Sequence, residues 1–557
     1  MADEIPSGST PGALRGGSGY KDGVYYSKRQ PVSIPNDPYL DFTSFTFRSG
    51  KYLDRVALVD APTGKSLSYR DVRQQVKSVA SGLADLGVKK GDVVMILSPN
   101  SIQYPVLLLA ITSIGAVVTA VNPLNTTKEV VVQAQDSKTK YLAAVPGLTA
   151  VAAVLKIPLI LMDSDIQEYP SYLKTEVAPI AYFTDLLQAD PRLAPKVRIR
   201  QTDTALVLYS SGTTGTSKGV VISHGSVIAS VCLSNDPSCK EDVQRTYIVT
   251  IPIYHLYGMV LVVGAQLTMG SKLVVLPRFE LPKFLEAIER YKVTHAQTVT
   301  PIFNALVRSP LVEKYDLRSL ENITVGAAPV PKATLIACSQ RYKNAFLRQG
   351  YALTESIGIA TGSVPTDSSP RLGSAGILAS NMEAMIVDVE CGKPLPPNHR
   401  GEIWLHGPAM MQGYLNNAKA TAETLDKNGW LHTGDAGYFD EDGNLYIVDR
   451  LKELIKYNDY QVAPAELEAL LTTHPQIADV AVAGFPDELH GQIPVAFVVR
   501  HKNSFLNETE VMQFVAEQVA PYKKVRKVVF VDSIPRLPSG KIIRRQLRLP
   551  TSGLSKL

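Results

Sequence analysis

A run of glycine and hydroxyl residues at positions 210–219 has the composition of a loop that binds phosphate. It reads Ser-Ser-Gly-Thr-Thr-Gly-Thr-Ser-Lys-Gly and directly follows a strand-like segment, Thr204-Ala-Leu-Val-Leu208. Glycines let a backbone turn its N–H groups toward an anion, hydroxyls add donors, and Lys218 adds a positive charge. A Walker P-loop has glycine before its lysine and Ser or Thr after it, whereas Ser217 and Gly219 stand here. The expected phosphate contacts are Ser210, Ser211, Gly212, Thr213, Thr214, Gly215 and Lys218.

The chain around this loop alternates between helix and strand patterns. Ser68 with Asp71 predicts a capping box, followed by apolar residues at helical spacing up to Gly87. Val93–Leu97 and Lys272–Leu276 have the pattern of buried strands, and Pro282–Tyr291 that of a helix. This alternation predicts an α/β fold with largely parallel sheets.

The pattern of predicted helices and strands changes past residue 395. Short β-like runs such as Gly401–His406 and Asn444–Val448 follow, and then a helix pattern at Ala465–Leu471 and strands at Val480–Ala483 and Pro494–Val499. We expect a large N-terminal domain of layered α/β sheets with a small β subdomain, and a small, mobile α+β C-terminal domain. The predicted bounds are a flexible lead-in at 1–35, the large domain at 36–449, the small domain at 450–549 and a tail at 550–557.

Composition excludes several classes of protein. The net charge is only +5 and basic residues are not clustered, so nucleic-acid binding is not expected. The four cysteines show no metal-ligand or CxxC spacing, which favours reduced thiols in an intracellular protein. Pro105–Val121 is too short to span a membrane and is broken by Thr112, Ser113 and Gly115, and a buried helix followed by a buried strand is expected there.

The two ends of the chain carry different signals. The N-terminus lacks the apolar segment of a secretory signal. The chain ends in Ser555-Lys556-Leu557, the tripeptide that the peroxisomal import receptor reads. A location in the peroxisomal matrix is therefore expected, and we expect a monomer.

The phosphate loop belongs to a longer series of motifs that resembles a known family. The loop resembles that of the adenylate-forming enzymes, which include acyl-CoA synthetases, firefly luciferase and the adenylation domains of peptide synthetases. Further motifs follow in the family's order, and residues 461–468 and 519–523 resemble the plant 4-coumarate–CoA ligases and their peroxisomal relatives in particular. The other motifs are Gln349–Glu355, Gly401–Gly407, Thr433–Asp435, Val448–Lys456 and Pro538–Ile542.

The resemblance implies activation of a carboxylic acid by ATP and transfer of the acyl group to coenzyme A. A carboxylate is a poor acyl donor, and conversion to a mixed anhydride with AMP overcomes this. The first step brings two anions together, so a cation between them stabilises the transition state. The resemblance assigns this role to Lys541, whose long side chain stands on a turn.

The resemblance also implies a nucleotide and metal site. Glu355 is the expected protein contact of Mg²⁺, which prefers few protein ligands, and Thr354 is expected at the α-phosphate. Tyr351 is expected against adenine, with Gly326-Ala-Ala328 as another wall, and Asp435 and Arg450 at the ribose. The expected ATP contacts also include Gln349, Gly350 and Lys541.

For the acid, the resemblance implies a pocket that suits an aromatic or an extended apolar acid. His255 is expected to gate the pocket or to position the acid rather than to act as a general base. The expected lining residues are His255, Tyr257, Leu261, Gly326, Ala352, Gly358, Ile359, Lys452 and Lys456.

For coenzyme A, the resemblance implies that the small domain rotates about Asp449-Arg450 between the two half-reactions. Arg278, Asn458, Asp459 and Gln461 are the expected CoA contacts. Relatives usually carry Lys-Gly or Ser-Gly at the positions of Asn458 and Asp459. Asn and Asp tolerate left-handed backbone, but a carboxylate near an anionic substrate predicts a weak CoA step.

Three alternatives compete with the ligase. A luciferase-like oxygenase shares the fold and the Ser-Lys-Leu end, although the 4-coumarate-type motifs disfavour it. A peptide-synthetase module is disfavoured because no carrier domain follows residue 549. An impaired homologue that only binds nucleotide is disfavoured by Lys541, Glu355 and Asp435 and favoured by Asn458-Asp459.

Overall fold

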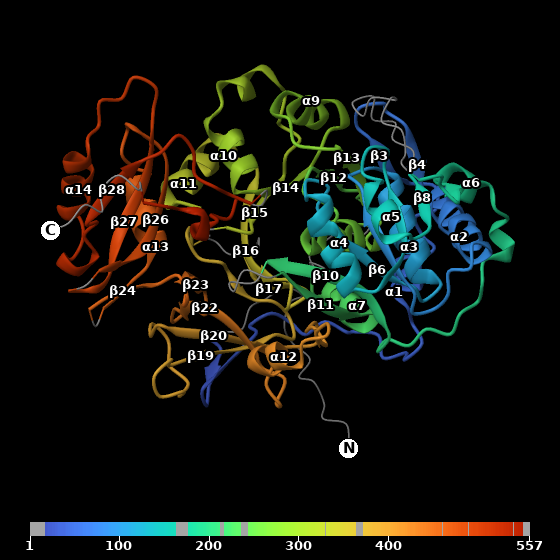
Figure 1. The fold of residues 1–557 in the computed structure, drawn as a ribbon, viewed down its shortest axis with the longest axis horizontal. Coiled ribbons are helices and arrows are strands. Elements are labelled where there is room, and N and C mark those ends of the chain that lie inside the picture. The colour runs from blue at the N-terminus through green and yellow to red at the C-terminus, as the bar shows by residue number, and fades with distance from the viewer. Residues whose placement is uncertain are drawn as a thin grey trace.

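The chain forms layers of sheet and helix with a smaller unit at one end (Figure 1). The computed structural model describes residues 17–162, 177–211, 217–234, 243–328, 330–363, 371–458, 460–487, 489–537 and 540–549. Within these residues the strands form four sheets. The α-helices are α1 Phe42–Thr46, α2 Tyr69–Asp85, α3 Gln103–Ser113, α4 Thr127–Asp136, α5 Ala150–Leu155, α6 Phe183–Gln188, α7 His224–Ser234, α8 Ala265–Thr268, α9 Leu281–Tyr291, α10 Thr300–Arg308, α11 Lys332–Arg341, α12 Ala418–Thr424, α13 Pro464–Leu471 and α14 Glu508–Ala516.

Two large, mostly parallel sheets make up most of the N-terminal part, as the α/β pattern predicted. Helices α2, α3 and α7 pack between them in one apolar core. The first sheet contains, in spatial order, β21 Gly413–Tyr414, β11 Ser217–Ser223, β10 Thr204–Ser211, β6 Val117–Ala120, β5 Val93–Leu97, β7 Thr139–Ala144, β8 Leu159–Leu161 and β9 Ala181–Tyr182. The second contains β18 Ile377–Leu378, β17 Gly358–Gly362, β16 Phe346–Leu353, β15 Asn322–Gly326, β14 His295–Val299, β12 Thr246–Val249, β13 Lys272–Val275, β3 Val56–Asp60 and β4 Ser66–Ser68.

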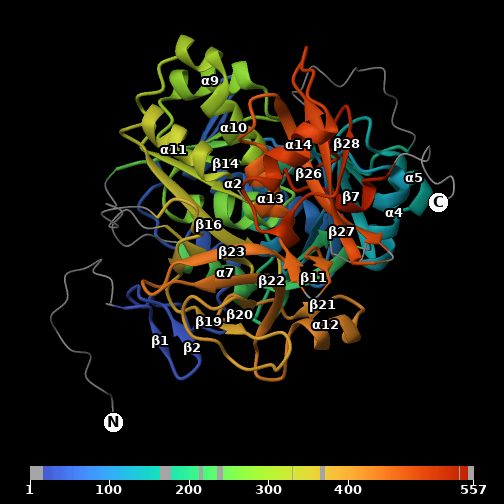
Figure 2. The same cartoon turned by 90° about the vertical axis from the view of Figure 1, so that its left-hand side faces the viewer.

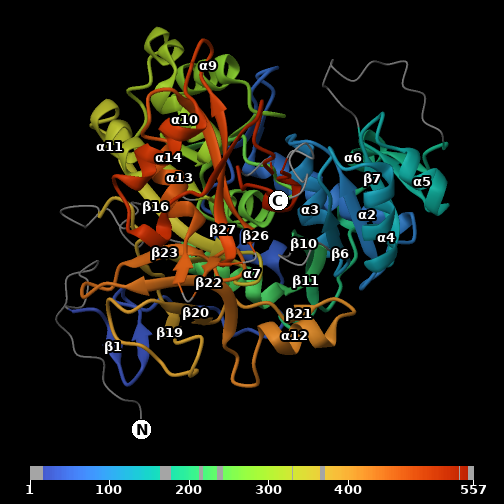
Figure 3. The same cartoon turned by 60° about the vertical axis from the view of Figure 1, so that its left-hand side comes forward.

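A third sheet lies below these two and beside the start of the C-terminal part (Figures 2 and 3). It contains β1 Tyr20–Lys21, β2 Val24–Tyr26, β19 Glu383–Val387, β20 Gly401–His406, β22 Leu431–Phe439 and β23 Leu445–Arg450. The expectation of a flexible lead-in up to residue 35 is wrong for β1 and β2. Tyr25 is fully buried, stacks on Phe439 at 4.4 Å between ring centroids, and donates a hydrogen bond to the Leu395 carbonyl at 3.2 Å, so it holds this segment in the sheet.

The C-terminal part has its own sheet and core. The sheet contains β24 Ile455–Tyr457, β25 Tyr460–Val462, β26 Ile477–Asp487, β27 Gly491–Arg500 and β28 Lys527–Phe530. Helices α13 and α14 cover it with apolar residues such as Leu467, Leu471, Val511 and Val515. This part is α+β, as expected, although β26 and β27 are longer at both ends than the strands that the sequence predicted.

Local signals in the sequence correspond closely to the structure. Ser68 caps α2 and Asp71 completes the capping box. The apolar stretch after Pro105 is a buried helix, α3, followed by the buried strand β6. Among the described residues, no helix is both long enough and apolar enough to cross a bilayer.

The phosphate loop differs from its prediction. Residues expected to belong to the loop extend two antiparallel strands, because β10 continues to Ser211 and β11 begins at Ser217. Ser210 pairs with Lys218 and Ser211 with Ser217. The expected contacts Gly212, Thr213, Thr214 and Gly215 lie outside the described residues. The paired backbone fixes the direction in which Lys218 leaves the sheet.

One buried amide connects the two large sheets at the carboxyl ends of their strands. Asn100, which follows β5, donates to the carbonyls of Ile251 at 3.1 Å and Leu276 at 3.3 Å. Its side-chain oxygen accepts from the Ile253 N–H at 2.8 Å. The loop thus held precedes a π-helical segment, Tyr257–Gly264, a geometry that often occurs at functional sites.

We expect Asn100→Leu to lower the free energy of unfolding by roughly 2–3 kcal/mol, because it leaves buried backbone groups without hydrogen bonds. Urea denaturation of the full chain measures this change. Ser98→Ala is the control, since Ser98 is equally buried in the same loop but bonds only the adjacent Pro99 carbonyl. Equal effects of the two substitutions would contradict the bridging role of Asn100.

Candidate active site

A cavity of about 630 Å³ lies where the large sheets, the third sheet and the C-terminal chain meet. Its wall includes the carboxyl end of β15, the residues that follow β16, and the hairpin of β10 and β11. Ligands of open parallel sheets characteristically bind at this edge. The predicted site residues in its wall are Ser210, Lys218, His255, Tyr257, Leu261, Gly326, Gly350, Ala352, Thr354, Glu355, Ile359, Arg450, Lys452 and Lys541.

Glu355 belongs to a polar cluster in the cavity wall. Its Oε1 accepts hydrogen bonds from the Ser210 hydroxyl at 2.9 Å and from the Tyr414 hydroxyl at 2.8 Å. Lys218 Nζ lies 4.7 Å from the centroid of the Tyr414 ring. The cluster therefore brings together a carboxylate that follows β16, two hydroxyls from β10 and β21, and a cation from β11.

The residues of this cluster fit a Mg²⁺ ion that is shared with a nucleotide. Among the described residues, no group of three or more His, Cys, Asp or Glu side chains could hold a metal ion. Mg²⁺ is usually bound through one or two carboxylates together with phosphate oxygens and water. Glu355 supplies one carboxylate in the wall of the cavity.

Asp435 and its partners form a second cluster. Tyr351, which was expected against adenine, donates its hydroxyl hydrogen bond to Asp435 Oδ2 at 2.5 Å. Arg450 Nε lies 3.3 Å from Asp435 Oδ1, since Asp435 on β22 and Arg450 on β23 are register partners. Burial raises the pKa of the Asp435 carboxyl above its ordinary value, and the positive charge of Arg450 offsets part of this increase. Two rigid partners thus orient this carboxylate.

Lys541 reaches the cavity from the C-terminal chain. Burial, and next the Arg450 charge, lower the pKa of its ammonium group. Gly540 before it has a φ of 87°, and an added Cβ would lie 2.8 Å from Pro301 of α10. Only glycine therefore fits between the turn and α10, and the turn places Lys541 in the cavity wall.

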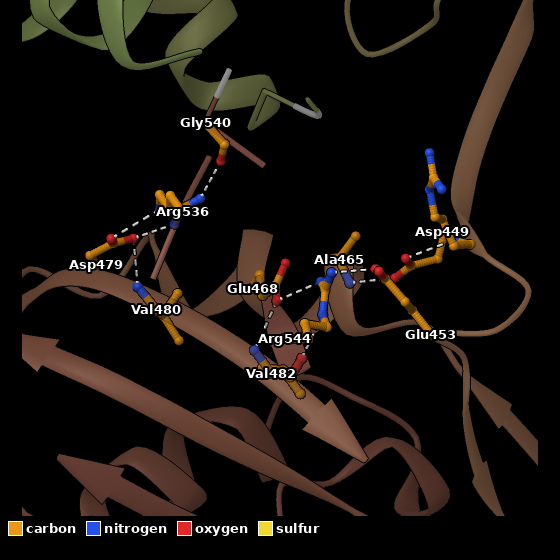
Figure 4. A network of polar contacts seen from close by, with 11 residues as sticks. Asp449, Glu453, Ala465, Glu468, Asp479, Val480, Val482, Arg536, Gly540 and Arg544 are labelled. Carbon is orange, nitrogen blue, oxygen red and sulfur yellow. Dashed lines mark hydrogen bonds and ion pairs between the residues drawn. The ribbon is translucent and has the colours of Figure 1, made fainter. Parts of the chain in front are cut away.

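A buried ion cluster holds the base of this turn (Figure 4). Arg544 donates to Glu453 Oε2 at 2.5 Å, to Glu468 Oε1 at 2.7 Å and to the Val482 carbonyl at 3.0 Å. Asp449, in the expected hinge, accepts from the Ala465 N–H at 2.9 Å. The cluster joins the segment of Lys541 to the residues that follow the hinge.

The acyl side of the cavity contains His255 and the start of the π-helical segment. Desolvation lowers the pKa of His255 to about 4, so its ring is neutral and a weak base near neutral pH, which fits a positioning role. The Tyr257 hydroxyl donates to Gln297 Oε1 at 2.7 Å. Gly358 packs behind the wall, since an added Cβ would lie 2.8 Å from Leu261 Cδ2.

Several predicted site residues lie outside the cavity wall. The Gln349 side chain accepts from the Gly373 N–H at 3.2 Å, and Arg278 pairs with Glu280 at 2.8 Å. Asn458 has a φ of 49°, the left-handed conformation that asparagine tolerates. The exposed residues outside the wall include Lys456, Asn458 and Gln461, while Asp459 lies outside the described residues.

The sequence reasoning missed residues of two kinds. Tyr414 lies 59 positions from its partner Glu355, and no local pattern shows that pairing. Another part of the cavity wall consists of polar side chains on, or directly before, neighbouring parallel strands. Polar residues at alternate positions, such as His295 and Gln297 of β14, could have indicated it. These wall residues are Arg245, Tyr247, His295, Gln297, Asn322, Thr324 and Arg348.

Comparison with known proteins identifies the class. The profile of the AMP-binding enzyme matches residues 45–415, and that of the AMP-binding enzyme C-terminal domain matches residues 466–541. The chain belongs to the AMP-binding enzyme family.

Within this family the chain is similar to plant CoA ligases. It is 44% identical to the probable CoA ligase CCL5 of Humulus lupulus over 545 residues, 96% of this chain and 98% of that protein. It is 43% identical to the peroxisomal OPC-8:0-CoA ligase 1 of Arabidopsis thaliana over 548 residues, 98% of this chain and 99% of that protein. Other relatives, at 40–44% identity, are 4-coumarate–CoA ligase-like proteins.

A solved structure agrees with this assignment. ATP-bound MatB of Rhodopseudomonas palustris superposes with a TM-score of 0.81 at 26% identity, over 91% of this chain and 97% of that one. The chain is an AMP-forming acyl-CoA synthetase, which makes an acyl-adenylate from ATP and a carboxylic acid and then a CoA thioester.

We expect Arg544→Met to lower the free energy of unfolding of the C-terminal part by about 3–5 kcal/mol, because it leaves buried carboxylates without their cation. Arg536→Met is the control, since its pair with Asp479 is about one-third exposed and such pairs contribute about 1 kcal/mol or less. Chemical denaturation measures both changes. Equal losses of unfolding free energy in the two variants would show that the buried Arg544 cluster stabilises the protein no more than the partly exposed Arg536 pair does.

Proposed function

We propose that this synthetase activates a hydroxycinnamate-type or other aromatic acid, or a medium or long oxygenated fatty acid, and that Lys541 is its adenylation cation. The supporting observation is that Lys541 of the C-terminal chain shares one cavity with Thr354, Glu355 and Lys218. A carboxylate oxygen of the acid attacks the α-phosphorus of ATP. The P–O bond to pyrophosphate breaks, and the acyl-adenylate remains.

The residues around this reaction have separate roles in the proposal. Lys541 lies between the carboxylate and the α-phosphate and stabilises the negative charge that they share. Glu355 would hold Mg²⁺, which supplies charge neutralisation at the phosphates. Asp435 and Arg450 bind the ribose, and Thr354 donates to the α-phosphate. His255 is neutral and positions the acid.

For the second half-reaction we propose rotation of the small domain, residues 450–549, against the large domain, residues 36–449. The expected hinge is Asp449-Arg450. Rotation withdraws Lys541 and brings in Asn458, Asp459 and Gln461, while Arg278 binds a phosphate of CoA. The thiol of CoA loses its proton to water, and its sulfur forms a bond to the acyl carbonyl carbon. The bond from that carbon to the AMP oxygen breaks, and AMP leaves with its electrons.

We also propose that the enzyme works as a monomer in the peroxisomal matrix. One relative carries a peroxisomal name. Ser555-Lys556-Leu557, outside the described residues, is the tripeptide that the import receptor binds when it ends a chain.

The adenylation role of Lys541 is tested by ATP–pyrophosphate exchange with a panel of aromatic and oxygenated acids. We expect Lys541→Ala to lower the exchange rate by at least about a hundredfold. Because the pKa of Lys541 is lowered, its charge is lost as pH rises through a value below that of an ordinary lysine. Exchange by the parent should therefore fall at alkaline pH, whereas Lys541→Arg keeps its charge and should lack this fall. The same alkaline fall in Lys541→Arg would contradict the assignment.

The CoA step is tested at Asp459. We expect Asp459→Gly to raise kcat/KM for CoA by roughly fivefold, the effect of about 1 kcal/mol of repulsion between two charges separated by water. Asp459→Asn removes the charge and keeps the size of the side chain. It therefore separates the effect of charge repulsion on CoA from the effect of the closer approach that glycine allows. Unchanged thioester kinetics at low CoA in both variants would refute the idea.

A further inference from the structure

A short segment at residues 411–415 connects two parts of the cavity wall that lie far apart in the sequence. The Leu415 N–H donates to the Gly219 carbonyl at 2.7 Å, beside the pairing of β21 with β11. The Met411 N–H donates to the Glu355 carbonyl at 3.0 Å. Backbone hydrogen bonds therefore fix this segment between the hairpin of β10 and β11 and the residue that would hold Mg²⁺.

Tyr414 of this segment uses its two chemically different parts on two different neighbours. Its hydroxyl donates to Glu355 Oε1 at 2.8 Å, and Lys218 Nζ lies over its ring, 4.7 Å from the centroid. The face of an aromatic ring carries partial negative charge and attracts a cation. All three side chains line the cavity. One tyrosine therefore contacts both a carboxylate and an ammonium group of the candidate active site.

These two charged groups do not pair with each other. In the part of the chain that the structure describes, Lys218 and Glu355 form no ion pair with one another, and each has its own contact on Tyr414. Opposite charges in one cavity wall attract, and an ion pair between them would engage both. Because the hydroxyl holds one group and the ring face the other, both charges stay available for a ligand.

The hydrogen bonds of Glu355 also distinguish its two oxygens. The hydroxyls of Ser210 and Tyr414 both donate to Oε1, and among the described residues no donor is bonded to Oε2. Burial, and next the charge of Glu355, raise the pKa of the Tyr414 hydroxyl, so it is protonated and a donor near neutral pH. Mg²⁺ takes few protein oxygens. Two donors thus fix the carboxylate through one oxygen and leave the other for the ion.

We propose that Tyr414 is a positioning residue for adenylation: its hydroxyl orients Glu355 toward the metal ion of the nucleotide, and its ring keeps Lys218 apart from Glu355 and ready for the phosphates. The inference rests on the proposed function, because that function puts Mg²⁺ at Glu355 and the phosphates of ATP in this cavity. Tyr414 acts through these two side chains and not on the reacting atoms. Substitution can separate its two contacts, because phenylalanine keeps the ring and lacks the hydroxyl, whereas leucine lacks both.

The test measures the binding of α,β-methylene-ATP, which is not cleaved at its α–β link, to the full chain by isothermal titration calorimetry. Each protein is titrated once with excess Mg²⁺ and once with EDTA. The ratio of the two affinities reports the part of binding that depends on Mg²⁺. The affinity in EDTA reports the contacts that the protein makes with the nucleotide alone.

We expect Tyr414→Phe to lower the affinity ratio about tenfold and to leave the affinity in EDTA unchanged, because a hydrogen bond to a charged group is lost while the ring stays beneath Lys218. The unchanged affinity shows that this variant is folded. Tyr414→Leu should lower the ratio at least as much and should also lower the affinity in EDTA about threefold, since the cation then loses its ring. In ATP–pyrophosphate exchange, raising the Mg²⁺ concentration should restore the rate of Tyr414→Phe.

A double-mutant cycle with Glu355→Gln separates a positioning role from a general structural one. In the Glu355→Gln background, Tyr414→Phe should change the affinity ratio by less than about twofold, because the charge that its hydroxyl orients is already gone. Tyr342→Phe is the matched control, since the Tyr342 hydroxyl donates to the Leu306 carbonyl at 3.0 Å and Tyr342 does not line the cavity. This control should keep both affinities of the parent.

The outcomes distinguish this inference from the proposed function. A parent enzyme whose nucleotide affinity does not depend on Mg²⁺ would overturn the metal role of Glu355, and the inference with it. A Mg²⁺-dependent parent whose ratio is unchanged in Tyr414→Phe, or a full effect of that substitution in the Glu355→Gln background, would overturn the role of the hydroxyl and leave the ligase intact. Equal affinities of Tyr414→Phe and Tyr414→Leu in EDTA would overturn the role of the ring.

Discussion

The guanidinium of Arg544 fixes where the C-terminal chain can place a cation. Arg544 follows Lys541 by three residues, and its partner Glu453 follows the expected hinge by the same distance. Burial raises the pKa values of Asp449 and Glu468, and the Arg544 charge lowers them, so these carboxylates depend on one cation for their charge. The hinge, the sheet of the small unit and the turn of Lys541 are thereby linked through one ion cluster.

The other half of the site is rigid for a different reason. Backbone pairing fixes Ser210, Lys218, Asp435 and Arg450 in strands, and Asn100 holds the loop before His255 against both large sheets. Within each pair, sheet hydrogen bonds set the relative positions of the side chains. In the proposed reaction, Lys541 is thus the residue whose position depends on the C-terminal chain.

The sequence predicted the α/β fold, most of the elements and many of the side chains that line the cavity, because motifs and periodicity are local. It could not predict partners that tertiary pairing brings together. Tyr414 reaches Glu355 only because β21 pairs with β11. The strand character of Tyr20–Tyr26 depends on a burial site that residues near 395 and 439 supply. The polar residues of the cavity wall alternate along their strands, but the register of those strands decides which of them lie side by side.

The polar side chains of the cavity wall and Lys541 come from different parts of the chain. The polar wall residues Tyr247, Gln297, Thr324 and Arg348 lie on the neighbouring strands β12, β14, β15 and β16, whereas Lys541 comes from the chain after β28. Hydrogen-bonded sheet therefore positions the first group, and the segment that Arg544 anchors positions the second. Because the two groups have separate supports, a wall side chain can be exchanged without any change in the segment that carries Lys541.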